Sequence, residues 1–391
     1  MSTLKVDGIR SNSATSDAIT LASDGTCTAN ITNNLSNRNL IINGAMQVAQ
    51  RGTSSLGSNE YGSVDRIWHY YQDVDESPTF SQVDVASGTS AYQAGFRKAF
   101  RVTNGNQTSG AGVSDQVQFE YRVEAQDIAN SGWNYTSSTS FLILSFYIKS
   151  SVAQAFNLFV KTEDGTEKGM PFSTPSLSAD TWTKVSFQIK GDSGISFYNN
   201  NGKGLSISFN AFLGTNYTDN SITNGEWIAW NSGTRCKDIT STWYTTNDAT
   251  LEITGLQLEV DHTGSGVATD FEHRSYAQEI ALCKRYYQQF PQSAADNYGP
   301  IGVGRIRNST NAHIVLTFPE MRSSPTCTKS GNLRILHAAT GTVVNSVASS
   351  HMARSTVFIE GIVSSGLAQG EGCILTADND ADGRITLSAE L

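Results

Sequence analysis

The sequence predicts an all-β protein: an N-terminal attachment segment, a jelly-roll β-sandwich, one short helix and a small C-terminal β-sandwich. Apolar and polar residues alternate in many short runs, glycine-containing turn dipeptides separate these runs, and only one segment has helical spacing. With 391 residues and 38% hydrophobic content, the chain is long enough to build more than one core.

The composition indicates a neutral polar surface. Charged residues make up 16% of the chain, against roughly 25% in an ordinary soluble protein, so Ser, Thr, Asn, Gln and Gly must cover the surface. The net charge of −9 is interpreted as a contribution to solubility. Because no Lys/Arg cluster follows the pattern of a phosphate backbone, nucleic acid is not expected as a partner.

The cysteines argue against a disulfide framework and against a zinc site. They are odd in number, far apart and without a CxxC pair: Cys27, Cys236, Cys283, Cys327 and Cys373. We therefore expect buried, inert thiols, a reducing compartment of synthesis and no cofactor.

Residues 1–38 form the first predicted segment. They are polar, and their main apolar anchors are Leu4, Val6, Ile9, Ile19 and Leu21. Burial of these few anchors cannot offset the entropy lost when the segment becomes ordered. Either a partner orders the segment, or it is a loose terminal tail.

Residues 39–272 are predicted to form one large antiparallel β-domain. Val185, Phe187 and Ile189 alternate with polar residues, as expected for a strand with one buried face. Residues 205–210 alternate in the same way, with Ser206, Ser208 and Asn210 on the face expected to be solvated. Residues 141–148 are apolar on both faces, which predicts a central strand.

The apolar phase reverses near Gly255. Leu251 and Ile253 are in one phase, and Leu256 and Leu258 are in the other. A strand cannot keep one face buried through such a reversal without a bulge, and Gly255 is the residue that permits one.

The predicted helix lies within residues 273–290 and runs from Tyr276 to Tyr287. Tyr276, Ile280, Cys283 and Tyr287 are spaced four, three and four apart, which gives a narrow seam. A helix of this length needs packing partners. A three-fold bundle of identical helices would supply them, and so would the chain's own sandwich. Residues 291–391 then form a second β-region of short strands.

The densest aromatic cluster consists of Trp227, Trp230, Trp243 and Tyr244. Two interpretations fit it: a platform on which sugar rings stack, or large side chains that fill the sandwich core.

Catalytic motifs are not found. The chain has no G-x-S-x-G, H-E-x-x-H or P-loop, and the acidic residues Asp261, Asp270 and Glu272 are explained by solvation or helix capping. Residues 378–383 resemble the start of a calcium loop, but position twelve is Ala389, so an Asx-rich turn is favoured and no metal is expected.

Several segments resemble bacteriophage tail fibre proteins, particularly those of marine and cyanobacterial podophages. They are the opening MSTLKV, residues 39–52 (NLIINGAMQVAQRG) with VDRIW at 64–68, and the distal FPEMR at 318–322 with the final AEL. The most specific match is the junction TGLQLEV at 254–260, ATDFEHRSY at 268–276 and EIALCKRYY at 279–287.

The resemblance implies an elongated homotrimer that attaches to the phage tail by its N-terminus and contacts a host surface glycan. An N-terminus without an apolar signal region agrees with a virion part assembled in the host cytoplasm, and the absence of a run of about 20 apolar residues excludes a membrane helix. We expect a non-enzymatic protein. The alternatives are a tailspike-type depolymerase, or a capsid or neck fibre with a purely structural role.

Overall fold

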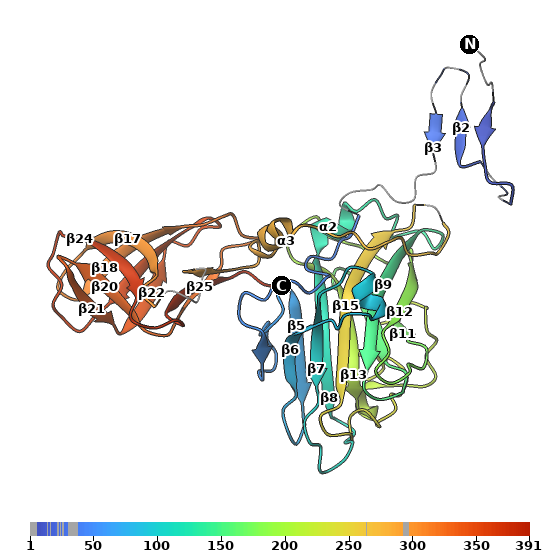
Figure 1. Ribbon diagram of the computed structural model, residues 1–391, viewed down its shortest axis with the longest axis horizontal. Coiled ribbons are helices and arrows are strands. Elements are labelled where there is room, and N and C mark those ends of the chain that lie inside the picture. The colour runs from blue at the N-terminus through green and yellow to red at the C-terminus, as the bar shows by residue number, and fades with distance from the viewer. Residues whose placement is uncertain are drawn as a thin grey trace.

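The computed structural model describes residues 6–13, 15, 17–21, 23, 25, 27–29, 38–262, 264–291 and 297–391. The protein is all-β, as predicted, with a large sandwich and a smaller C-terminal lobe (Figure 1). Near the N-terminus, β1 (Gly8–Ile9), β2 (Ile19–Leu21) and β3 (Cys27–Ala29) form a small antiparallel sheet. No helix in these ranges is long and apolar enough to cross a membrane.

Two six-stranded antiparallel sheets form the sandwich. The first has the order β14 (Ile228–Ala229), β11 (Lys168–Ser173), β10 (Asn157–Thr162), β13 (Lys203–Leu213), β8 (Gln116–Glu124) and β5 (Ile67–Gln72). The second has the order β12 (Thr183–Lys190), β9 (Phe141–Ser150), β15 (Thr250–Val260), β7 (Lys98–Thr103), β6 (Thr79–Asp84) and β4 (Ser54–Ser55). The connections contain α1 (Ser90–Gln93), α2 (Ala125–Ala129) and the 3-10 turn η1 (Thr215–Tyr217).

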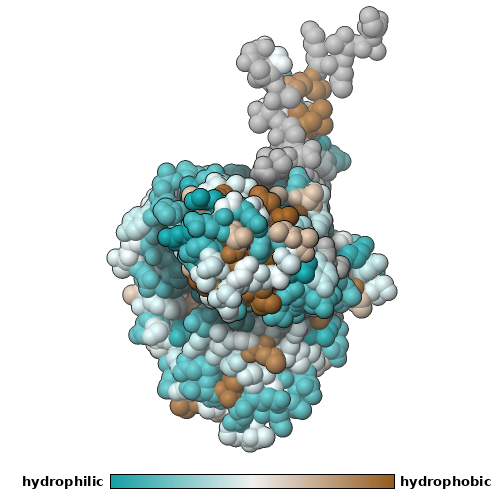
Figure 2. Space-filling model, turned by 90° about the vertical axis from the view of Figure 1, so that its left-hand side faces the viewer, coloured by the Kyte–Doolittle hydropathy of each residue, from teal (hydrophilic) through white to brown (hydrophobic). Residues whose placement is uncertain are grey.

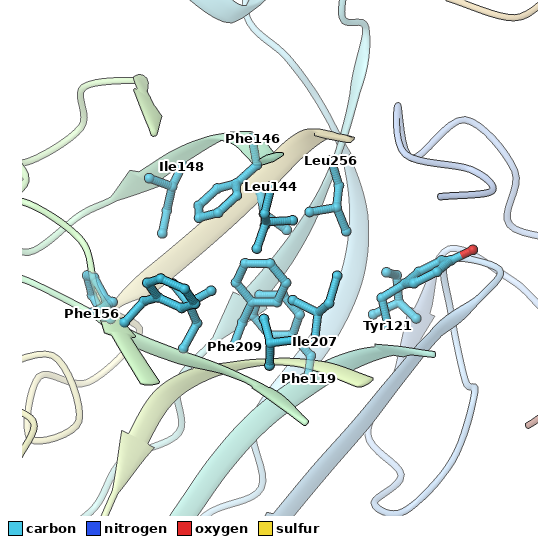
Figure 3. Close-up of a cluster of buried hydrophobic side chains, with 14 of the residues drawn as sticks. Phe119, Tyr121, Leu144, Phe146, Ile148, Phe156, Ile207, Phe209 and Leu256 are labelled. Atoms are coloured by element: carbon cyan, nitrogen blue, oxygen red, sulfur yellow. The ribbon is translucent and has the colours of Figure 1, made fainter. Parts of the chain in front are cut away.

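The core lies between the two sheets, where aromatic side chains from both meet (Figure 3). Phe119 of β8 and Phe209 of β13 stack with ring centroids 5.0 Å apart. Phe146 of β9, from the opposite sheet, meets Phe209 edge-on at 5.1 Å. Burying each such side chain contributes about 1.5–3 kcal/mol, so this layer accounts for much of the sandwich's cohesion.

Strand β13 differs from the one-face-buried strand that its alternation predicts. Ser206, Ser208 and Asn210 are 0%, 1% and 1% exposed, although they point away from the core. Neighbouring segments cover them. Glu163, which follows β10, and Glu120 of β8 accept hydrogen bonds from Ser206 and Ser208 at 2.5 and 2.7 Å, and the buried thiol of Cys236 lies 4.0 Å from the Asn210 amide nitrogen. The prediction of a solvated face was therefore wrong, and the outer side of this sheet carries a buried polar layer.

The bulge predicted at Gly255 is confirmed. The pairing of β15 with β9 shifts register between Thr254 and Gln257, and Gly255 has a φ of +64°. A Cβ atom at this position would lie 2.5 Å from the Phe96 ring, so glycine is required by space as well as by backbone angle. Beyond the bulge, Leu256 and Leu258 return to the core.

Substituting Gly255 tests this double requirement. We expect Gly255→Ala to destabilise the protein by about 2–4 kcal/mol, because it adds a steric clash to the cost of a left-handed alanine. Gly88→Ala is the matched control, since Gly88 has a φ of +82° and nothing within 4 Å of an added Cβ. Urea unfolding measures both variants. Equal losses would contradict a steric role for Phe96.

The helix is shorter than predicted. Helix α3 spans Tyr276–Cys283 and begins with a capping box between Ser275 and Gln278. The chain then turns and enters β16 (Tyr287–Phe290), so the prediction of a helix reaching Tyr287 was wrong. The last turn tightens, since the N–H groups of Arg285 and Tyr286 donate to the carbonyls three residues earlier at 3.2 and 2.9 Å. The Tyr286 carbonyl then accepts from the N–H group of Ala389, and the Arg285 side chain donates twice to Glu124 at 2.8 Å.

The C-terminal lobe has its own core between a seven-stranded and a three-stranded sheet. The larger sheet has the order β21 (Thr340–Val344), β20 (Leu333–His337), β24 (Gly372–Ala377), β17 (Pro300–Ile306), β18 (Asn311–Thr317), β23 (Thr356–Ile362) and β22 (Ser346–Ser350). The smaller sheet has the order β16, β25 (Arg384–Ser388) and β19 (Thr326–Ser330).

A buried ion pair joins the lobe to the sandwich. Arg66 of the sandwich is 1% exposed and donates a hydrogen bond to Glu390, which follows β25. The Arg66 guanidinium also lies 3.5 Å above the Tyr286 ring. Burial alone would lower the pKa of Arg66, but the charge of Glu390 and the neighbouring tyrosines, Tyr286 foremost, together outweigh this effect and raise that pKa. Arg51 forms a second ion pair with Glu390 at 3.1 Å.

Removing the Glu390 charge tests this junction. We expect Glu390→Gln to lower the free energy of unfolding by about 3 kcal/mol, because it leaves Arg66 buried without a counter-charge. The control is Asp84→Asn, which removes an exposed carboxylate paired with Lys98 and is expected to change stability by less than about 0.5 kcal/mol. Urea unfolding compares the two, and an unchanged Glu390→Gln protein would contradict the role assigned to the pair.

Candidate functional site

The predicted aromatic platform is divided by the fold. Trp243 and Tyr244 are 0% and 1% exposed and lie in the sandwich core, where Tyr244 stacks on Phe212 at 4.3 Å. They cannot contact a ligand at the surface, so for these two residues the core-filling interpretation holds. Trp227 is half-buried, and its indole N–H donates to the Lys190 carbonyl at 2.6 Å.

Trp230 remains on the outer side of the first sheet. It follows β14, and its ring lies 5.1 Å from Phe159 of β10. The ammonium group of Lys161, two residues along β10, lies 5.0 Å from the same ring. The two rings and the Lys161 side chain form one group, which we call the Trp230 wall.

A second aromatic wall stands on β5 at the edge of the same sheet. Trp68 and Tyr70 point outward from alternate positions, and their rings stack with centroids 5.7 Å apart. The Arg122 guanidinium lies 4.4 Å from the Trp68 ring. We call this group the Trp68 wall. Sequence reasoning missed it, although two outward aromatics spaced two apart in IWHYY were an available signal.

The floor between the walls is polar and comes from β8 and β13. Ser208 and Asn210 lie opposite Glu120 and Gln118 in the strand register. The side-chain oxygens of Gln118 and Asn210 are buried and find no hydrogen-bond donor among the residues that the structure describes. Each unsatisfied acceptor costs about 1–3 kcal/mol. At the floor's end, Arg235 donates to Gln116 at 2.9 Å.

This sheet face offers a surface suited to sugars. From β10 to β5 it spans three strand spacings, about 14 Å. Aromatic rings at both sides can stack on the apolar faces of sugar rings, while the half-buried carboxylate of Glu120 and the guanidinium groups of Arg122 and Arg235 match hydroxyl donors and acceptors. We call this surface, from the Trp230 wall to the Trp68 wall, the sheet face.

Two carboxylates, Glu120 and Glu163, lie on the sheet face. Burial alone would raise the pKa of Glu163, but the Ser206 hydrogen bond and the charges of Lys203 and Lys161 outweigh it and hold the pKa below its usual range. A general acid for glycoside hydrolysis needs the opposite shift. Glu163 is therefore not suited to the general-acid role.

The acidic residues near the junction have structural surroundings. Asp261 and Glu272 accept hydrogen bonds from the backbone N–H groups of Gly266 and Asn39, both at 2.8 Å. Asp270 lies beside Tyr147, whose pKa is raised by burial and by that charge. The helix cap is Ser275, so the interpretation of these acids as N-caps was wrong.

The loop at 378–383 is a turn, as favoured by the sequence. The Asp380 carboxylate accepts from the backbone N–H groups of Asn332 and Asp382, both at 2.8 Å. Within the described part of the chain, no three His, Cys, Asp or Glu side chains converge as metal ligands.

The predicted trimer seam is largely used within the chain. Cys283 and Tyr287 are 1% and 7% exposed, and Tyr287 lies under the Arg51 guanidinium at 3.7 Å. Ile280 is half-buried, and only Tyr276, at 58%, is well exposed. The prediction that these four residues form one continuous seam facing identical helices was therefore wrong.

The predicted attachment residues lie partly in the small N-terminal sheet. Ile9 and Leu21 are 53% and 39% exposed, Val6 is 37% exposed, and Ile19 is half-buried. Leu4 lies outside the described residues.

Comparisons with known proteins give distant structural likenesses. No protein-family model matches the chain, and no curated protein matches it by sequence. The enzymatically active domain of tailspike protein 4 of bacteriophage CBA120 is similar at 10% identity and a TM-score of 0.31, over 57% of this chain and 21% of that chain. A protein of Bacteroides thetaiotaomicron, to which sugar binding is provisionally assigned, has 11% identity and a TM-score of 0.31, over 56% of this chain and 99% of that chain. A family 11 carbohydrate-binding module of a Clostridium thermocellum cellulosomal cellulase has 13% identity and a TM-score of 0.25, over 53% of this chain and 94% of that chain.

The matched region thus spans about a fifth of the tailspike chain but nearly all of the two sugar-binding chains. Because the TM-scores are well below 0.5, the function proposed below rests on this chain's own residues.

Proposed function

We propose that this protein is a non-enzymatic binding protein that adheres to a surface glycan through the sheet face. The observation that carries the proposal is the pair of aromatic walls, around Trp68 and Trp230, on either side of a polar floor. Rings at both sides would stack on sugars, and the half-buried charged groups between them, Glu120, Arg122 and Arg235, would exchange hydrogen bonds with the sugar hydroxyl groups. The lowered pKa of Glu163 argues against this residue as the general acid of a hydrolase.

The aromatic walls give a direct test. We expect Trp68→Ala and Trp230→Ala each to weaken glycan binding roughly tenfold, as truncation of a central aromatic contact does in other interfaces. Binding of fluorescently labelled protein to polysaccharide arrays measures the effect. Tyr92→Ala is the control, because Tyr92 is a half-buried aromatic of α1 outside the sheet face. Binding that survives both tryptophan variants would overturn the assignment of this face.

The same polysaccharides distinguish the depolymerase alternative. A binding protein releases no new reducing ends from a glycan that it retains on the array. Steady release that Glu120→Gln abolishes would instead assign hydrolysis to the sheet face.

We further propose that the protein is a phage tail fibre, a homotrimer held to the virion by its N-terminal segment, with a capsid or neck position as the alternative. The resemblance of the junction segments supports this proposal. So do the exposed Ile9 and Leu21, which a virion partner would cover.

An apolar row on the lobe supports self-association. Ile374, Val303 and Val315 are neighbours across β24, β17 and β18, and are 36%, 67% and 52% exposed. Half-buried Leu336 and Phe358 extend the row on either side. Figure 2, which faces the lobe, shows hydrophobic surface among the hydrophilic surface there.

The oligomeric state tests the fibre proposal. Light scattering of the purified chain is expected to give the mass of a trimer, and Val303→Asp with Val315→Asp to give a monomer, since buried carboxylates would oppose association. Val267→Asp is the control, because Val267 is 69% exposed outside the lobe. A monomeric wild-type protein would count against the fibre proposal and leave glycan binding untouched.

A further inference from the structure

A cavity of about 850 Å³ lies at the junction of the sandwich, helix α3 and the lobe. Its volume is in the range of small-molecule sites, which often occur between domains. Its walls come from residues 49–52, from α3 and the residue after it, and from β16, β19 and β25. It shares no residue with the sheet face.

The cavity has an excess of positive charge. Arg51, Lys284 and Arg384 line it, against a single lining carboxylate, that of Asp382, which lies 3.9 Å from Arg384. Glu390, which is not among the lining residues, is shared between Arg51 and Arg66. The three cations come from separate segments that only the fold brings together. Because the whole chain carries a net charge of −9, this local excess is not part of a generally basic surface.

Arg51 has an unused donor. One terminal nitrogen of its guanidinium bonds Glu390 at 3.1 Å, and the plane of the group lies 3.7 Å from the Tyr287 ring. The other terminal nitrogen is buried and finds no acceptor within the described ranges. A fixed guanidinium with an N–H group that lacks an acceptor is suited to an oxyanion.

The remaining lining is suited to a sugar. Tyr276, whose ring is 58% exposed, offers an aromatic surface, and Gln289, Ser330 and Thr386 offer amide and hydroxyl groups. Stacking and hydroxyl recognition thus lie beside the cations.

We propose that this cavity is a second binding site and that it takes an acidic sugar, a saccharide unit that carries a carboxylate or a phosphate. Arg51, Lys284 and Arg384 hold the anionic group, and Tyr276 stacks on the ring. The site goes beyond the glycan binding of the sheet face, because it selects for charge.

Calorimetry on the full chain tests the proposal with glucuronate, glucose 6-phosphate, glucose and inorganic phosphate. We expect one or both anionic sugars to bind on the order of tenfold more tightly than glucose or phosphate, and added salt to weaken that binding. The two anionic sugars separate a carboxylate preference from a phosphate preference. Equal affinity for glucose, or for inorganic phosphate, would overturn the proposal.

Variants locate the site. Lys284→Gln with Arg384→Gln is expected to lose the anionic preference, whereas Lys98→Gln with Lys190→Gln, the same loss of charge elsewhere, is expected to retain it. If the first pair fails to fold, as thermal melting would show, Tyr276→Ala gives the second test through a roughly tenfold loss of affinity. Unchanged affinity in a folded variant would overturn the assignment. Trp68→Ala is expected to leave this binding intact, so failure here and failure of the sheet face are distinguishable.

Discussion

The buried pair between Arg66 and Glu390 sets the arrangement of the whole chain. A charge that is 1% exposed must keep its partner, so the residues after β25 are held against the sandwich. Tyr286, stacked on the Arg66 guanidinium, is held in the same place, and α3 ends just before it. This contact therefore ties the end of the lobe and the segment after α3 to one point of the sandwich.

Glu124 strengthens the same junction. Burial alone would raise its pKa, but hydrogen bonds from Arg285 and Tyr286 outweigh this effect and hold that pKa below its usual range. A carboxylate of this kind stabilises the fold above its ordinary pKa and loses that contribution as the pH falls through its lowered value. The junction is thus an electrostatic joint between two separately cored β-domains, and the junction cavity lies beside the elements that it fixes.

The polar layer on the outer side of the first sheet shows why the sheet face was hard to predict from the sequence. The alternation at 205–210 correctly places Leu205, Ile207 and Phe209 in the core. It does not reveal that Glu120 and Glu163 cover Ser208 and Ser206, because those contacts join residues far apart in the sequence. Of the aromatic cluster, only Trp230 reaches this face, and its counterpart, Trp68, lies about 160 residues earlier.

The sequence by itself determined the all-β class, the central strand at 141–148 and the bulge at Gly255, because period-two burial and glycine's backbone freedom are local properties. Only the tertiary structure decided where the helix ends, which aromatics are buried and which cations share a cavity. These features depend on partners such as Glu124 for Arg285 and Glu390 for Arg66. Side-chain chemistry alone does not specify which distant residue will satisfy a buried charge or cover a ring.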